Sequence, residues 1–121
     1  MPTTDLFHNA TDTVRFDAGS PVFRQGDAGD RMYVVKSGEL EIEVDGRVIE
    51  AVGPGSIVGE MALIDDSARS ATVTARSDCE LVPIDERRFM FLVQQTPHFS
   101  LLVMRVLAAR LRRMDTLAAA G

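Results

Sequence analysis

Glycine spacing is the feature of this sequence that most restricts its fold. Eight of the nine glycines lie between residues 19 and 59, where they separate short runs rich in valine, isoleucine, phenylalanine and tyrosine. Short β-prone runs with glycine between them are typical of antiparallel β structure, and they favour a small barrel or jelly roll. The eight glycines are Gly19, Gly26, Gly29, Gly38, Gly46, Gly53, Gly55 and Gly59.

A hairpin is the clearest local prediction within this β region. Leu40, Ile42 and Val44 alternate with glutamates, which gives one apolar and one charged face. Asp45–Gly46 follows, and this residue pair suits a type I′ turn between two strands. A second alternating strand is predicted over residues 71–76.

After Asp85 the hydrophobic period changes from that of strands to that of helices. Asp85 is placed to cap a first helix, which must end before Pro97 because the residue preceding a proline is disfavoured in α geometry. A longer second helix follows as far as about residue 115. Its apolar residues share one broad face at 100° per residue, and Arg110 falls in the middle of that face.

Length and composition predict one domain over residues 1–121, with strands in 13–85 and helices in 86–115. The hydrophobic fraction of 45% and the charged fraction of 26% are ordinary, and no apolar run approaches the roughly 20 residues that span a bilayer. The N-terminus lacks the pattern of a secretory signal, and Cys79 is the only cysteine. We therefore expect a cytoplasmic protein without a membrane span.

Charge is divided unevenly along the chain. Residues 1–85 carry 16 acidic and 7 basic side chains, whereas residues 86–121 carry 2 acidic and 6 basic ones. An acidic body argues against non-specific contact with nucleic acid, which requires a basic face. The few residues after the second helix leave no room for a helix-turn-helix, so we expect no direct DNA binding.

The segment "GEMALIDDSARSATV", residues 59–73, combines the groups that a cyclic nucleotide monophosphate requires. Gly59 lets a ligand approach the backbone and leads into a short helix whose N–H groups favour an anion. Arg69 can place a planar, permanently charged fork against two phosphate oxygens. Glu60 would repel a phosphate but can accept a hydrogen bond from a ribose hydroxyl, and Ser70 offers a hydroxyl to the phosphate or to a purine edge.

This segment and "FRQGDAGDRMYVVKSGELEI" resemble the cyclic nucleotide-binding domain family, the β-roll of catabolite-activator-type regulators, regulatory subunits of cyclic-AMP-dependent kinase and cyclic-nucleotide-gated channels. The resemblance covers roughly residues 13–115. It implies a mainly β fold with α: an antiparallel β-roll (double-stranded β-helix or jelly roll), a short phosphate-binding helix and two C-terminal helices. It also implies Glu60 for the ribose 2′-hydroxyl and Arg69 for the cyclic phosphate. The groups implied around the phosphate are the backbone of Gly59, Met61, Ala62 and Ala71, with Ser70 beside it.

The resemblance leaves two features open. Many family members have proline before the arginine, where this chain has Ala68, so the binding loop is expected to be less preorganised. Arg110 needs a partner if it is buried. In relatives an arginine on the last helix reaches the purine, where stacking would satisfy it, but pairing with a barrel carboxylate or extension to water would do so equally. Leu107, Leu111 and Met114 are candidates for an apolar lid or for plain packing.

Together these features predict a stand-alone regulatory module that binds cyclic AMP, with cyclic GMP as the second choice. Ser70 rather than threonine favours cyclic AMP by the family's pattern. Binding would shift a population in which the C-terminal helices close over the base, without chemistry, cofactor or metal. We expect an unidentified effector protein in trans, and the last helix leaves a homodimer open.

Two alternatives belong to other classes of protein. The first is a non-binding β-roll that acts in interaction or dimerisation and has a degenerate pocket. The second is a cupin-type metalloenzyme, which requires clustered histidines as metal ligands. His8 and His98, the two histidines, both lie outside the predicted β region.

Overall fold

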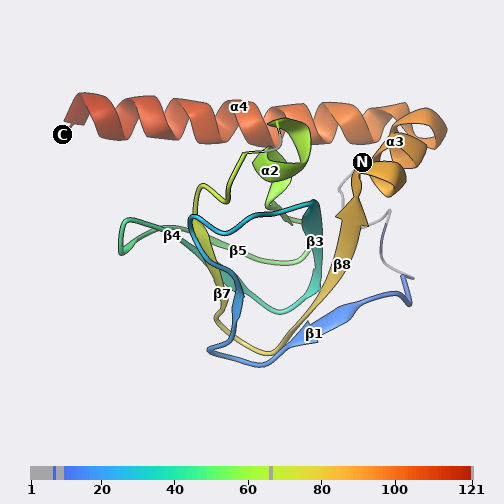
Figure 1. The fold of residues 1–121 in the computed structure, drawn as a ribbon, viewed down its shortest axis with the longest axis horizontal. Helices are drawn as coiled ribbons and strands as arrows, with labels where there is room; N and C mark the ends of the chain where they lie inside the picture. Colours follow the sequence, from blue (N-terminus) through green and yellow to red (C-terminus); the bar gives the residue numbers. More distant parts are fainter. Residues whose placement is uncertain (1–6, 8–9, 66, 121) are drawn as a thin grey trace.

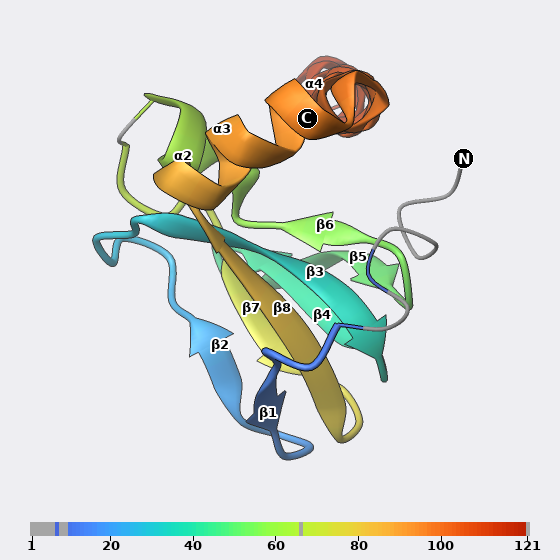
Figure 2. The same cartoon turned by 90° about the vertical axis from the view of Figure 1, so that its right-hand side faces the viewer.

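Two four-stranded sheets form a roll, with the helices gathered at one end (Figure 1, Figure 2). The computed structural model describes residues 7, 10–65 and 67–120, with side chains described as far as Arg113. Neighbouring strands in both sheets are antiparallel, which confirms the predicted β-roll. The first sheet contains, in spatial order, β1 (Val14–Phe16), β8 (Cys79–Asp85), β3 (Arg31–Ser37) and β6 (Ile57–Val58). The second contains β2 (Pro21–Phe23), β7 (Thr72–Ala75), β4 (Leu40–Val44) and β5 (Arg47–Val52).

The buried core consists of two hydrophobic clusters on opposite faces of β3 and β8. Val35 and Leu81 belong to the cluster between the sheets, whereas their neighbours Val34 and Val82 belong to the cluster beneath the helices. Because both faces of these strands are covered, their central residues, 32–35 and 81–84, form apolar runs without alternation. Cys79, the single cysteine, is 2% exposed in the first cluster.

The predicted hairpin joins β4 and β5. Asp45 and Gly46 have φ of 51° and 79°, the two positive values that a type I′ turn requires. The Gln25 amide donates to Asp45 Oδ1 at 3.0 Å and its oxygen accepts from the Asp45 N–H at 3.0 Å, so the turn is held to the loop after β2. A register shift between Ile42 and Glu43 then pairs Ile42 with Glu50.

Three helices complete the described fold: α2 (Glu60–Asp65), α3 (Glu86–Gln95) and α4 (Pro97–Ala120). Asp85 caps α3 by accepting a hydrogen bond from the Arg88 N–H at 2.8 Å, as predicted. Helix α4 continues five residues past its predicted end at residue 115. The added residues are mostly alanine and leucine, which are strong helix formers.

Helix α4 is anchored on the second cluster through its first turns. Phe99 is fully buried, with its ring centroid 6.0 Å from that of Phe7 and 5.8 Å from that of Phe89. Of the predicted lid residues, Leu107 packs against this cluster and Leu111 is exposed, while the side chain of Met114 lies outside the described part.

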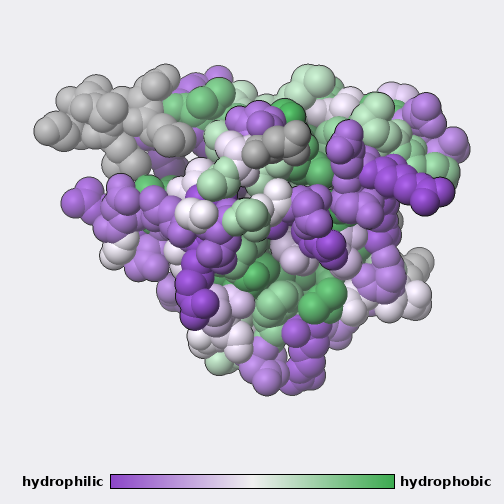
Figure 3. Space-filling view, viewed as in Figure 1, coloured by the Kyte–Doolittle hydropathy of each residue, from purple (hydrophilic) through white to green (hydrophobic). Residues whose placement is uncertain are grey.

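The outer surface is mostly hydrophilic on the face seen in Figure 3, with hydrophobic residues interrupting it along the helices and in the middle of the roll. Within the part of the chain that the structure describes, no helix combines the length and the apolar character needed to cross a membrane.

Candidate functional site

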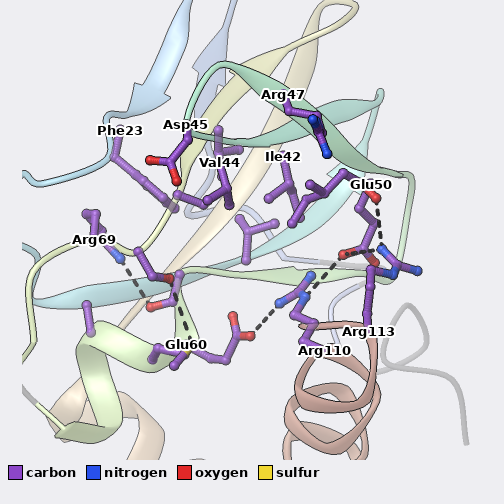
Figure 4. Close-up of a pocket in the computed structure, with 18 residues that line it drawn as sticks. Phe23, Ile42, Val44, Asp45, Arg47, Glu50, Glu60, Arg69, Arg110 and Arg113 are labelled. Carbon is purple, nitrogen blue, oxygen red and sulfur yellow. Dashed lines mark hydrogen bonds and ion pairs between the residues drawn. The ribbon is translucent and has the colours of Figure 1, made fainter. Parts of the chain in front are cut away.

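A cavity of about 440 Å³ lies between the β4–β5 hairpin, α2 and the middle of α4 (Figure 4). Its walls come from both sheets, because β6 belongs to one and β4, β5 and β7 belong to the other. All eight residues that the sequence analysis assigned to the ligand line this cavity, although their contacts with a ligand stay predictions. These residues are Gly59, Glu60, Met61, Ala62, Arg69, Ser70, Ala71 and Arg110.

Arg69 is 6% exposed, and its side chain is held from several sides. Its Nη1 donates to the Gly59 carbonyl at 3.1 Å, and its Cζ lies 4.0 Å from the centre of the Phe23 ring. A Cβ atom on Gly29 would lie 2.3 Å from Arg69 Nε, and one on Gly59 would lie 2.6 Å from Nη1. The two glycines therefore provide the space that the guanidinium occupies.

The charge of Arg69 has no ion-pair partner within the described residues, and its buried Nε has no hydrogen-bond acceptor. Burial lowers the pKa of the guanidinium, and the nearby charges of Asp30 and Asp27 oppose that shift without contacting it. A buried cation without an anion is unfavourable. The site is therefore electrostatically suited to an anion that brings hydrogen-bond acceptors.

Glu60 begins α2 after Gly59, whose φ of 79° turns the chain into the helix. The Glu60 side chain is 3% exposed, and its Oε1 accepts a hydrogen bond from Arg110 Nη1. Arg110 also donates from Nε to Glu50 Oε2 at 3.3 Å and from Nη2 to the Ile57 carbonyl at 2.8 Å. Of the roles left open for Arg110, the structure shows pairing with a barrel carboxylate, Glu50 of β5, and also with Glu60 of α2. Contact with a purine stays a prediction.

The remaining polar group of the predicted set is exposed. The Ser70 hydroxyl contacts Met61 Sδ at 3.8 Å, and Ser70 itself is open to solvent at the cavity wall. Its hydroxyl is therefore accessible to a ligand in the cavity.

Sequence reasoning missed four charged residues of the cavity wall: Asp45, Arg47, Glu50 and Arg113. Glu50 of β5 accepts a hydrogen bond from Arg110 and forms an ion pair with Arg113, whose Nη1 lies 3.3 Å from Glu50 Oε2. The same Nη1 donates to the Ile49 carbonyl at 3.1 Å. Arg113 follows Arg110 by three positions, so helical spacing already places the two on one face. No comparable signal in the sequence identifies Glu50.

The cupin alternative requires a metal centre, and the described residues contain no group of three or more histidine, cysteine, aspartate or glutamate side chains placed to hold a metal ion. His98 is exposed at the start of α4. His8 lies outside the described residues.

Comparison with known proteins gives the same family over most of the chain. The family model described as "Cyclic nucleotide-binding domain" matches residues 13–96. The cyclic AMP receptor protein of Thermus thermophilus is 34% identical over 83% of this chain and 49% of its own length. The cAMP-dependent protein kinase regulatory subunit of Yarrowia lipolytica is 39% identical over 68% of this chain and 22% of its own length.

The fold comparison agrees with these matches. The crystal structure of Thermus thermophilus catabolite activator protein superposes with a TM-score of 0.76 at 31% identity, covering 92% of this chain and 60% of that one. The chain spans about half of the length of the cyclic AMP receptor protein and about a fifth of that of the kinase regulatory subunit. From the family match and the shared roll, the chain belongs to the cyclic nucleotide-binding domain family.

Proposed function

We propose that the chain is a regulatory module whose ligand is cyclic AMP, with cyclic GMP as the alternative nucleotide. The observation that carries this proposal is the buried guanidinium of Arg69, which lacks a carboxylate partner among the described residues and lines an open cavity. A cyclic phosphate would supply the missing negative charge and two oxygens for the arginine fork. The cavity of about 440 Å³ is also within the usual size of small-molecule sites, roughly 300–1,000 Å³.

The other polar groups support the same ligand. Glu60 would accept the ribose 2′-hydroxyl, and Ser70 would lie beside the phosphate. Backbone groups of Gly59, Met61, Ala62 and Ala71 would surround that phosphate. The names of both curated relatives refer to cyclic AMP, which favours this nucleotide over cyclic GMP.

Signalling would use the position of α4. This helix contributes Arg110 and Arg113 to the cavity wall, so a change in occupancy acts on it directly. A ligand with different affinity for two positions of α4 would shift the population between them. An effector in trans, or a second copy of the chain, would bind one of these two positions of α4 in preference to the other.

A non-binding β-roll is the second candidate, and one observation favours it. Arg110 already satisfies the buried Glu60 carboxylate, so this part of the cavity requires no ligand to be stable. The unpaired Arg69 is the observation against it.

Calorimetric titration with each cyclic nucleotide tests the proposal. We expect wild type to bind cyclic AMP at one site per chain, and Arg69→Ala to lose roughly 30-fold or more in affinity, because removing one partner of a desolvated charge pair costs about 2–5 kcal/mol. Arg15→Ala is the matched control, since Arg15 is exposed and pairs with Asp17 and Asp78 instead of lining the cavity. Absence of binding heat with both nucleotides would favour the non-binding candidate.

A further inference from the structure

Arg110 is held in place by three different parts of the roll. Each of its three nitrogens donates to a separate acceptor: Nε to Glu50 of β5, Nη1 to Glu60 of α2, and Nη2 to the Ile57 carbonyl of β6. Its side chain is 19% exposed, so these hydrogen bonds are mostly shielded from water. The plane of the guanidinium is consequently fixed relative to the cavity.

Only one of the two Glu60 oxygens is used by this arrangement. Within the described residues, the Glu60 carboxylate accepts one hydrogen bond, which comes from Arg110 and goes to Oε1. Figure 4 shows the carboxylate at the cavity wall, with one oxygen on the line to Arg110 and the other directed away from it. A carboxylate has about four acceptor positions, so Oε2 keeps its full capacity for a ligand hydroxyl.

We propose that Arg110 is a positioning residue for Glu60: it fixes Oε1 so that Oε2 is presented to the ribose 2′-hydroxyl, and Glu50 in turn positions Arg110. This inference rests on the proposed function. It adds a series of three charged side chains, Glu50, Arg110 and Glu60, of which the last contacts the sugar. It assigns Arg110 to recognition of the sugar. Contact with the purine would require the guanidinium to leave three shielded acceptors, one of them a buried carboxylate, which is costly.

The test compares two ligand ratios, because each ratio isolates one part of the nucleotide. Cyclic AMP and 2′-deoxy cyclic AMP differ only in the hydroxyl, whereas cyclic AMP and cyclic GMP share the sugar and phosphate and differ only in the purine. In wild type we expect cyclic AMP to bind roughly tenfold or more tightly than its 2′-deoxy analogue, as for a hydrogen bond to a charged group. Glu60→Gln gives the reference value for a weakened hydroxyl contact.

For Arg110→Gln we expect the hydroxyl ratio to fall towards the Glu60→Gln value while the ratio of cyclic AMP to cyclic GMP stays at its wild-type value. Glu50→Gln is expected to lower the hydroxyl ratio in the same direction by a smaller factor, because it acts through Arg110. Glu50 is 21% exposed, whereas Glu60 is 3% exposed, so a change at Glu50 disturbs the buried core less. Glu50→Gln therefore provides the test if Arg110→Gln does not fold.

Arg105→Gln is the matched control. Arg105 lies on the same helix and carries the same charge, but it is exposed and does not line the cavity. We therefore expect its hydroxyl ratio to equal that of wild type. Arg110→Lys, which keeps the charge but cannot reach three acceptors, is expected to restore part of the ratio lost in Arg110→Gln.

Two results overturn the inference in distinguishable ways. If Arg110→Gln keeps the hydroxyl ratio but loses the discrimination between cyclic AMP and cyclic GMP, the arginine reads the purine and the proposed function survives. If wild type binds neither nucleotide, the proposed function fails and the positioning role fails with it.

Discussion

At the scale of single residues, the site depends on two glycines beside Arg69 that have no side chain to fill its space. The guanidinium fits between Gly29 and Gly59 because neither carries a side chain. The two glycines differ in one respect. Gly59 also has a positive φ of 79°, so its substitution would strain the backbone, whereas Gly29 has no such constraint.

Gly29→Ala therefore separates binding from stability. The three atoms nearest to the added Cβ all belong to the Arg69 side chain, at 2.3–2.9 Å, so the arginine is expected to move and the fold to remain. We expect the affinity for cyclic AMP to fall by roughly tenfold or more, while the free energy of unfolding changes by less than about 0.5 kcal/mol. Titration calorimetry and urea denaturation measure the two quantities.

Gly53→Ala is the control for this substitution, because Gly53 has open space around its Cβ position and no positive φ. Its affinity should equal that of wild type. A Gly29→Ala protein that binds as tightly as wild type would show that the present position of the guanidinium is not the one used for the ligand.

At the scale of elements, α3 depends on its N-cap. The Asp85 carboxylate accepts from the Arg88 N–H at 2.8 Å at the point where β8 ends. Asp85→Ala is expected to lower the free energy of unfolding by about 1 kcal/mol and the melting temperature by roughly 4 °C, because the Arg88 N–H loses its hydrogen-bond acceptor. Scanning calorimetry measures this change, with the exposed neighbour Glu86→Ala as control. Equal melting temperatures for Asp85→Ala and wild type would contradict the capping role.

The elements themselves were largely predictable, because local rules agree with the fold. The alternation around Ile42, the Asp45–Gly46 turn and the Asp85 cap all have strong short-range signals, and the motif of residues 59–73 predicted the residues of one cavity wall. Glu50 was not predictable. A regular hairpin would pair Ile42 with Ile49 and direct Glu50 outward, but the register shift pairs Ile42 with Glu50 and brings the carboxylate to the cavity.

At the scale of the whole molecule, the cavity joins parts that are distant in the sequence. Its walls combine both sheets with α2 and α4, so a ligand would hold all four together. A ligand that binds only the folded state stabilises it by an amount that depends on its concentration relative to its Kd.

Thermal unfolding with and without nucleotide is the corresponding prediction. At 100 times its Kd, cyclic AMP should add about 2.7 kcal/mol and raise the melting temperature by roughly 10 °C. Arg69→Ala should show almost no shift at the same concentration. An equal shift in both proteins would mean that the nucleotide binds away from this cavity.

The attachment of α4 changes in character along its length. The first turns are held by buried phenylalanine and valine side chains, whereas Arg110 and Arg113 are held by ionic contacts with glutamates. Dissolved ions weaken charge attraction where it is open to water, and they do not loosen apolar burial. Raising the ionic strength would therefore release the far half of the helix before its beginning, with Arg113, at 45% exposure, affected before Arg110.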